Sequence, residues 1–230
     1  MKIDTMTTRQ LASYFDYSLL TPNCRQEEFD RFLATARALH PYSVAINGSW
    51  VSYAVDQLKD SDVKVGSTAG FPFGQMSVAT KVSEARLALD EGADEIDYVL
   101  NISRLLDHDY DYIAREMREM AAVCHDHEAV CKVILENCYL TTEEIRAACL
   151  TAVAEGMDFV KTSTGFGPGG AELKDVRLMK ETVGILAGVK AAGAMRSLYK
   201  TAQMIEAGAT RIGSAFLSQI LEEFDRRNKK

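Results

Sequence analysis

Short apolar runs alternate with longer amphipathic segments along the whole chain of 230 residues. Polar and glycine-containing turns bound the runs, which is typical of strands buried on both faces of a parallel sheet. The pattern predicts strands at Tyr14–Tyr17, Ser43–Ile46, Val63–Ala69, Glu95–Leu100, Val130–Leu135, Asp158–Thr162, Gly188–Lys190 and Thr210–Gly213.

The segments between the runs have helical spacing, and several open with a polar capping residue and close with glycine. Thr141 precedes one such segment and Gly156 follows its end, as the capping preferences of helices predict. Clear examples are Gln26–Leu39, Val78–Glu91, Tyr110–His125, Thr142–Glu155, Leu173–Val183 and Arg196–Ala207.

Similar turns recur between helix and strand, such as Asp90-Glu91-Gly92-Ala93-Asp94 and Ile205-Glu206-Ala207-Gly208-Ala209. Eight strands joined by helices predict an α/β protein, a (β/α)8 TIM barrel, forming a single domain over residues 1–230. A doubly wound open sheet is the alternative, but no GxGxxG follows the first strand. In a barrel, the active site lies at the carboxyl ends of the strands.

Polar residues gather at those predicted strand ends. One such charge is usually a salt bridge at the edge of the core. Several partly buried ammonium groups repel one another and are costly to desolvate, so a cluster of them indicates a functional site. The set comprises Asp16, Asn47, Asp97, Asn101, Lys132, Glu136, Lys161, Thr162 and Lys190.

Lys161 is the strongest catalytic candidate. It ends an apolar run and precedes Thr162 and a loop with Gly165 and Gly167. Burial lowers the pKa of an amine and makes it a nucleophile toward carbonyl groups, and glycines let backbone N–H groups approach an anion. Lys190, as a neighbouring cation, would lower that pKa further.

These groups suggest a reaction. The neutral Lys161 amine would attack a carbonyl and form an iminium, an electron sink for C–C cleavage or formation. Asp97, through a bound water, would move protons. Lys132 would hold Asp97 ionised or bind a substrate hydroxyl. The expected catalytic residues are Lys161, Lys190, Asp97 and Lys132.

Composition narrows the class of protein. A net charge of −7 without a basic stripe argues against nucleic-acid binding, and no apolar run reaches membrane-spanning length. The five cysteines form no CxxC pair and no signal segment is recognised, which favours a reducing cytoplasm. Histidines and cysteines do not converge, so neither a metal nor another cofactor is expected. Arg226–Lys230 is expected to be a solvated tail.

Motifs along nearly the whole chain carry a family resemblance. They are Phe15–Pro22, Val44–Asn47, Gly70–Gly74, Ala93–Asp97, Lys132–Glu136, Asp158–Gly167, Gly188–Gly193 and Arg211–Gly213. The chain resembles deoxyribose-phosphate aldolases, class I aldolases on a TIM barrel, and the Lys161 and Lys190 segments are specific when taken together. The resemblance implies that Lys161 forms the Schiff base, Lys190 lowers its pKa and Asp97 relays protons. It also implies metal-free, reversible cleavage of 2-deoxyribose 5-phosphate to acetaldehyde and glyceraldehyde 3-phosphate.

Three segments depart from the family pattern. Gly193–Arg196 reads Gly-Ala-Met-Arg where Gly-Gly-Val-Arg is usual, and Gly48–Trp50 lacks a usual proline. Ala215 and Phe216 stand where two serines usually help hold the phosphate. Because Phe216 offers no side-chain hydrogen-bond donor, we expect a weakened phosphate site unless Ser214 or Ser218 compensates.

The expected substrate is therefore a small sugar phosphate or aldehyde. One alternative keeps the lysine chemistry on an unphosphorylated or differently substituted aldehyde. Another is a non-catalytic sugar-phosphate-binding barrel, which would not need the paired lysines. A homodimer or larger homo-oligomer stays open. The candidate substrate contacts are Asp16, Asn47, Thr162, Gly165, Gly193, Arg196, Gly213 and Ser214.

Overall fold

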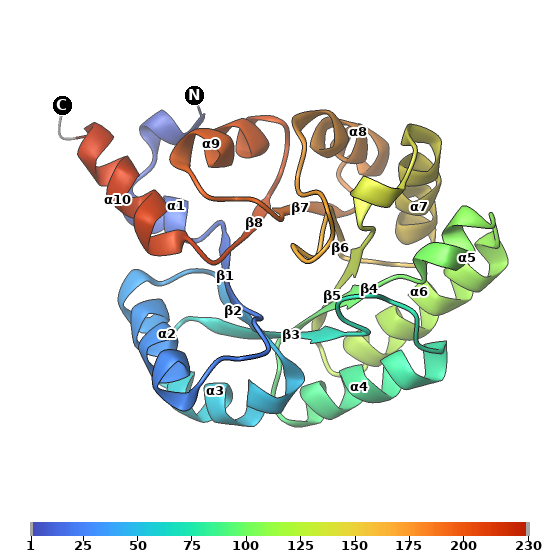
Figure 1. Ribbon diagram of the computed structural model, residues 1–230, viewed down its shortest axis with the longest axis horizontal. Helices are drawn as coiled ribbons and strands as arrows, with labels where there is room; N and C mark the ends of the chain where they lie inside the picture. Colours follow the sequence, from blue (N-terminus) through green and yellow to red (C-terminus); the bar gives the residue numbers. More distant parts are fainter. Residues whose placement is uncertain (1, 229–230) are drawn as a thin grey trace.

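Eight parallel strands close into a barrel in sequence order, with helices around the outside (Figure 1). The computed structural model describes residues 2–228. The predicted (β/α)8 fold is confirmed. The strands are β1 (Phe15–Leu19), β2 (Ser43–Ile46), β3 (Lys64–Ala69), β4 (Glu95–Val99), β5 (Val130–Ile134), β6 (Phe159–Lys161), β7 (Gly188–Ala192) and β8 (Arg211–Ser214).

Alternation along the strands separates the polar interior of the barrel from its apolar outer core. Successive side chains of a strand point to opposite faces. In β4, Glu95 and Asp97 join a buried group of charges, whereas Ile96 and Tyr98 pack into the apolar cluster between sheet and helices. The period-2 pattern of a strand therefore decides which of its residues can reach the site.

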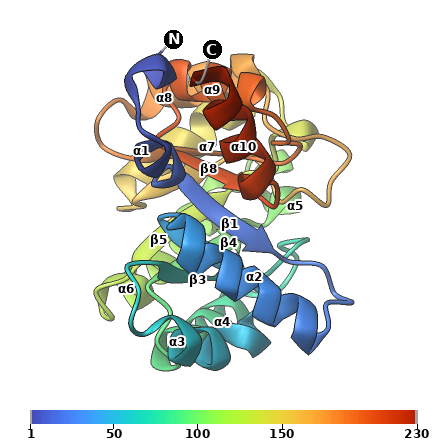
Figure 2. The same cartoon turned by 90° about the vertical axis from the view of Figure 1, so that its left-hand side faces the viewer.

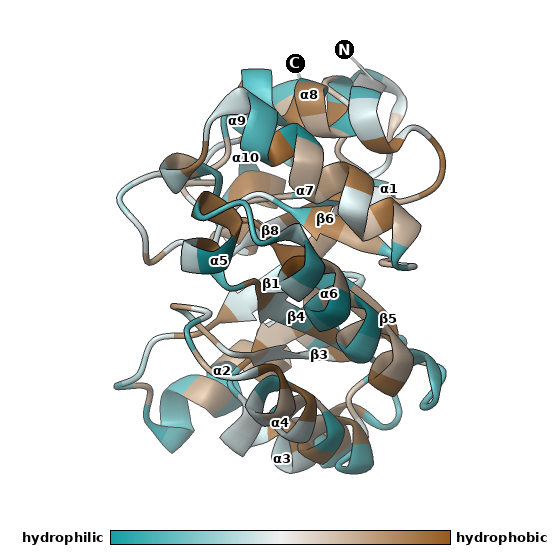
Figure 3. Cartoon of the chain, turned by 90° about the vertical axis from the view of Figure 1, so that its right-hand side faces the viewer, coloured by the Kyte–Doolittle hydropathy of each residue, from teal (hydrophilic) through white to brown (hydrophobic). Residues whose placement is uncertain are grey.

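The helices cover the sheet and present both hydrophilic and hydrophobic residues, as α4 and α6 show in Figure 3. The α-helices are α1 (Thr8–Ala12), α2 (Gln26–Leu39), α3 (Val51–Leu58), α4 (Val78–Asp90), α5 (Ile102–Leu106), α6 (Tyr110–His125), α7 (Thr142–Ala154), α8 (Leu173–Val183), α9 (Leu198–Glu206) and α10 (Leu217–Asn228). Short 3-10 helices are η1 (Lys2–Thr5), η2 (Gly48–Trp50) and η3 (Asn137–Tyr139).

The six helices named from the sequence are present, with small shifts at their ends. The one expected at Arg196 begins at Leu198, because Ser197 is its N-cap and accepts a hydrogen bond from the backbone N–H of Lys200. Helices α1, α3, α5 and α10 were not identified from the sequence.

The two ends of the described chain meet where α1 and α10 lie side by side (Figures 1 and 2). The Thr8 hydroxyl donates to Asp225 Oδ1 at 2.5 Å. The segment expected to be a solvated tail is partly helical: residues Arg226–Asn228 are exposed and form the end of α10. The last two lysines lie outside the described residues. No helix within 2–228 has the length and apolar character needed to cross a bilayer.

Candidate active site

Asp97 lies at the centre of a buried group of charges inside the barrel. Its Oδ2 accepts hydrogen bonds from Lys161 Nζ at 2.7 Å and Lys190 Nζ at 2.6 Å. Its Oδ1 accepts from Lys132 Nζ at 2.9 Å. These side chains come from β4, β5, β6 and β7, and all are buried. The structure thus brings together the four residues that the sequence marked as catalytic.

Asp16 and Glu95 continue this charge cluster on the other side of Lys132. Lys132 Nζ lies 2.7 Å from Glu95 Oε2 and 3.8 Å from Asp16 Oδ2. Arg211 Nη1 donates to Asp16 Oδ1 at 2.6 Å and to Glu95 Oε2 at 3.1 Å. Lys190 also pairs with Asp16. Asp16, expected to bind substrate, therefore holds cations in place within the barrel.

Sequence reasoning did not select Glu95 and Arg211 as site residues. Glu95 precedes Asp97 by two positions in β4, so strand alternation places both on one face. Arg211 opens β8, and its guanidinium lies 3.6 Å from the ring centroid of Tyr42. The alternation of side chains along β4 could therefore have identified Glu95 as a site residue from the sequence. The partners of Arg211 depend on the closure of β8 against β1.

Burial sets the protonation of Lys161. The loss of hydration lowers the pKa of Lys161 to about 8, with Lys190 as the leading cation that assists and Asp97 as the anion that opposes. We expected Lys190 to cause much of this lowering of the pKa, whereas burial is the larger cause. A substantial fraction of Lys161 is a neutral amine near pH 8.

Asp97 and Lys132 keep their ionised forms. Burial alone would raise the pKa of Asp97, but Lys132, Lys161 and Lys190 hold it well below its ordinary value. Burial would likewise lower the pKa of Lys132, but Asp97 and Glu95 outweigh it and raise that pKa. Asp97 thus stays a carboxylate in the resting site, as expected from its neighbours.

A cavity of about 410 Å³ opens above Lys161 and Lys190 at the carboxyl ends of the strands. Both lysines line it, so the buried charges have a face accessible to a small molecule. Of the predicted substrate contacts, those that line it are Gly165, Gly193, Arg196, Gly213 and Ser214.

The family model described as DeoC/LacD family aldolase matches residues 13–222 of this chain. The chain belongs to this family. It is 48% identical over 215 residues to deoxyribose-phosphate aldolase of Caldanaerobacter subterraneus subsp. tengcongensis, covering 93% of each chain. It is 46% identical over 219 residues to that of Thermococcus kodakarensis, covering 94% of this chain and 98% of the relative.

The architecture agrees with solved aldolases of the same name. The tetrameric deoxyribose phosphate aldolase from Aeropyrum pernix superposes with a TM-score of 0.90 at 28% identity, covering 97% of this chain and 94% of that one. Membership in the DeoC/LacD family makes the chain an aldolase-type lyase on a TIM barrel.

Three predicted substrate contacts of this DeoC/LacD aldolase do not line the cavity: Asp16, which pairs with cations inside the barrel, Thr162 and Asn47. The Thr162 hydroxyl donates to the carbonyl of Ala192 at 3.0 Å and accepts from its N–H at 3.1 Å. It therefore ties the end of β6 to β7. Asn47 follows β2, half buried, and is absent from the cavity lining.

The hydroxyl of Ser214, next to Ala215 and Phe216, is engaged within the protein. Ser214 Oγ donates to the carbonyl of Met195 at 2.6 Å and accepts from the N–H of Phe216 at 2.9 Å. Ser218 does not line the cavity. Neither serine therefore presents a free hydroxyl to the cavity in place of Ala215 and Phe216.

The other two departures from the family pattern have separate consequences. Trp50 stacks on Phe29 with ring centroids 4.3 Å apart, so it packs between η2 and α2. Ala194 has φ 55°, a left-handed conformation that favours glycine, and it also lines the cavity. An alanine there carries backbone strain that the usual glycine would avoid.

Glu136 forms hydrogen bonds with the start of the glycine-rich loop that follows β6. The carboxylate of Glu136 accepts from the backbone N–H of Thr164 at 3.2 Å and from its hydroxyl. This contact fixes the start of the loop, whose Gly165 and Phe166 line the cavity. Within residues 2–228, no group of three or more His, Cys, Asp and Glu side chains is placed to hold a metal ion.

Proposed function

We propose that this aldolase cleaves 2-deoxyribose 5-phosphate reversibly to acetaldehyde and glyceraldehyde 3-phosphate through a Schiff base on Lys161. The observation that carries the proposal is Lys161 itself: a buried amine with its pKa lowered to about 8, lining the cavity. The names of the relatives from Caldanaerobacter subterraneus and Thermococcus kodakarensis support this substrate.

The proposed reaction begins with the neutral amine. Lys161 Nζ attacks C1 of the open-chain sugar, and loss of water gives an iminium. The C2–C3 bond then breaks, its electron pair moves toward the iminium to give an enamine, and the C3 hydroxyl loses its proton as glyceraldehyde 3-phosphate leaves. Protonation of the enamine at C2 and hydrolysis of the resulting iminium release acetaldehyde and restore Lys161.

The neighbours of Lys161 have distinct proposed roles. Lys190 disfavours a second ammonium beside it. Lys132 keeps Asp97 ionised through the 2.9 Å contact. As an ammonium becomes an iminium it gives up two of its three N–H bonds, so Asp97 Oδ2 becomes free to accept from a water that carries protons between the reacting atoms.

The direct test is a cleavage assay. Incubation with 2-deoxyribose 5-phosphate should release acetaldehyde and glyceraldehyde 3-phosphate in equal amounts. Lys161→Met should lower kcat on the order of 10³-fold or more, as expected for removal of a nucleophile. Absence of cleavage by the parent would overturn the proposed substrate, and activity retained in the variant would overturn the assignment of Lys161.

A second candidate substrate is an aldehyde without a phosphate. The observation in its favour is the engaged hydroxyl of Ser214 beside the apolar ring of Phe216. The chemistry at Lys161 would be unchanged. Comparing kcat/KM for 2-deoxyribose and its 5-phosphate separates the two, because a strong preference for the unphosphorylated sugar is expected only of this candidate.

A homo-oligomer is the proposed assembly. The Aeropyrum pernix relative is tetrameric. This chain exposes apolar side chains beyond the site: Ile185 is 97% exposed and Leu186 72% exposed in the turn before β7, and Tyr199 is 68% exposed on α9. Light scattering after size exclusion distinguishes monomer, dimer and larger forms. A cytoplasmic location stays a prediction.

A further inference from the structure

Arg196 is a cation at the cavity wall whose charge is not neutralised by the protein. It is exposed and lines the cavity that contains Lys161. Within the described residues, it makes no ion pair with a carboxylate. By contrast, Arg211 beneath the cavity contacts both Asp16 and Glu95. Arg196 is therefore available to an anionic group that enters the cavity.

Phe216 lies against this guanidinium. The Cζ atom of Arg196 is 5.3 Å from the centroid of the Phe216 ring, and both side chains line the cavity. A guanidinium near an aromatic face is attracted by the ring and loses part of its conformational freedom. Phe216 thus occupies a position from which it orients a charged donor.

The nearby serine hydroxyls are not available to donate a hydrogen bond to an anion in the cavity. Ser214 uses its one hydroxyl proton on the carbonyl of Met195, and it also accepts from the backbone N–H of Phe216. Ser218 does not line the cavity. Arg196 lines the cavity with Phe216, carries a charge and several donors, and has no carboxylate partner within residues 2–228.

We propose that Phe216 is a positioning residue that holds Arg196 across the cavity wall, so that the enzyme selects aldehydes with an anionic tail through a stacked guanidinium. The inference rests on the proposed function and assigns the tail of that substrate. A guanidinium can pair with two phosphate oxygens at once. The aromatic ring at position 216 then contributes to anion recognition although it donates no hydrogen bond.

The test compares kcat/KM for 2-deoxyribose 5-phosphate with that for 2-deoxyribose, taken as a ratio. Arg196→Gln should lower this ratio roughly 10- to 100-fold, mainly through a higher KM for the phosphorylated sugar. Phe216→Leu should lower it about 2- to 5-fold. Phe216→Tyr, which keeps the ring, should retain the parent ratio within about 2-fold.

Coupling between the two positions separates positioning from a merely structural role. If Phe216 acts through Arg196, the double variant Arg196→Gln/Phe216→Leu should have the same ratio as Arg196→Gln alone. The ratio in the parent should also fall as salt is raised, because recognition by charge is screened. Additive losses in the double variant, or a ratio unchanged in Arg196→Gln, would overturn the inference.

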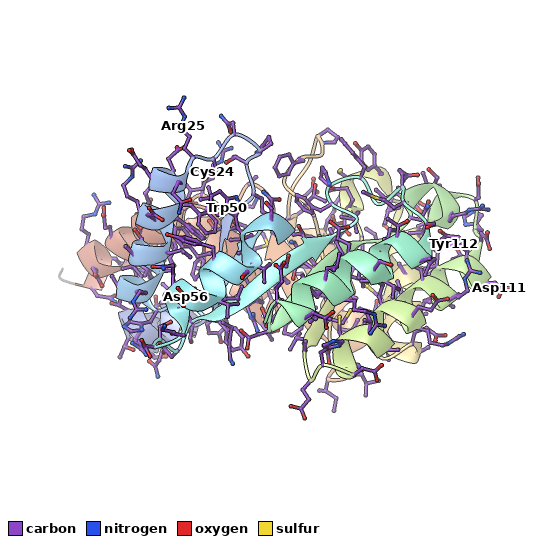
Figure 4. The ribbon with its side chains drawn as sticks, turned by 90° about the horizontal axis from the view of Figure 1, so that it is seen from below. Cys24, Arg25, Trp50, Asp56, Asp111 and Tyr112 are labelled. Carbon is purple, nitrogen blue, oxygen red and sulfur yellow. The ribbon has the colours of Figure 1, made fainter. Side chains whose placement is uncertain are left out.

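Arg115 on α6 provides a matched control. Its Cζ atom lies 5.2 Å from the centroid of the Tyr112 ring, and its Nε atom lies 3.8 Å from Glu119 Oε1. Figure 4 shows Tyr112 at the outer edge of the molecule. Arg115→Gln should leave the ratio unchanged. A fall equal to that in Arg196→Gln would assign the effect to net charge and overturn the inference.

The inference and the proposed function fail in different ways. Reduction with borohydride in the presence of acetaldehyde reports the Schiff base without involving the anionic tail. A trapped adduct together with an unaltered substrate ratio in the Arg196 and Phe216 variants would overturn only the inference. Absence of an adduct would instead overturn the proposed lysine chemistry.

Discussion

Lys161 and Asp97 are separated by 64 positions in the sequence, yet Lys161 Nζ lies 2.7 Å from Asp97 Oδ2. Lys190 donates to the same oxygen atom. Lys132 has Glu95 as a further partner and Lys190 has Asp16, whereas Asp97 is the ion-pair partner found for Lys161 within residues 2–228. Lys161 is thus the least compensated ammonium of the three lysines.

The balance of charges in the cluster explains which group gives up its proton. The four cations of the cluster, Lys132, Lys161, Lys190 and Arg211, share three carboxylates, Asp16, Glu95 and Asp97. Loss of one proton makes the numbers equal. Uncompensated charge is costly in a buried site, so the proton is lost most easily from the lysine with the fewest partners.

The first prediction concerns the covalent adduct. Incubation with acetaldehyde and borohydride should reduce an imine on Lys161, because it combines a lowered pKa with a place in the cavity lining. Peptide mass mapping locates the adduct. Lys190 lines the same cavity and serves as the internal comparison. An adduct on Lys190 or Lys132 instead would contradict the assignment.

The second prediction is a pH profile. Below pH 8 most Lys161 carries a proton and is not nucleophilic, so kcat/KM should rise about tenfold per pH unit and level off above a pKa of about 8. Initial rates from pH 6 to 9.5 give the profile. A flat profile over this range would show that deprotonation of Lys161 does not govern the rate.

The third prediction tests Lys190. Lys190→Leu removes a cation near Lys161 and leaves more of Asp97 to stabilise its ammonium, so the pKa of Lys161 should rise. Activity should fall near neutral pH and recover in part at higher pH. A profile that is lower in height but has the parent's midpoint would rule out the electrostatic role. Circular dichroism and thermal unfolding serve as the control for folding.

The fourth prediction concerns stability. Arg211→Met leaves Asp16 and Glu95 without the guanidinium that joins them. Breaking a buried ion pair by removing one partner should cost about 3–5 kcal/mol in the free energy of unfolding. Urea denaturation measures this. Arg227→Met, which breaks an exposed pair with Asp4, is the matched control and should have a much smaller effect.

The fifth prediction is that activity survives chelation. In the proposed reaction the Lys161 iminium is the electron sink, and no step requires a metal ion. Incubation with EDTA followed by desalting should leave kcat unchanged. Loss of activity that is restored by a divalent ion would point to a metal-assisted aldol reaction instead.

The hydrophobic pattern alone was enough to predict the barrel. Strands of a parallel sheet are buried on both faces and read as apolar runs, and the helices between them keep one apolar side. The same pattern placed Lys161, Lys190, Lys132 and Asp97 at or within strands. Because parallel strands end on one side of a barrel, their meeting followed from the fold class.

The contacts at the rim depended on tertiary structure. Thr162 and Ser214 carry hydroxyls that suit a ligand, but backbone groups from other strands and loops occupy them. The Cζ atom of Arg196 lies 5.3 Å from the centroid of the Phe216 ring only because the ends of β7 and β8 are neighbours. The sequence alone determines where the strands lie, because the pattern of buried and exposed residues within each strand is set by neighbouring positions in the chain. Which partner satisfies a donor is decided by chain segments that meet only in the folded barrel.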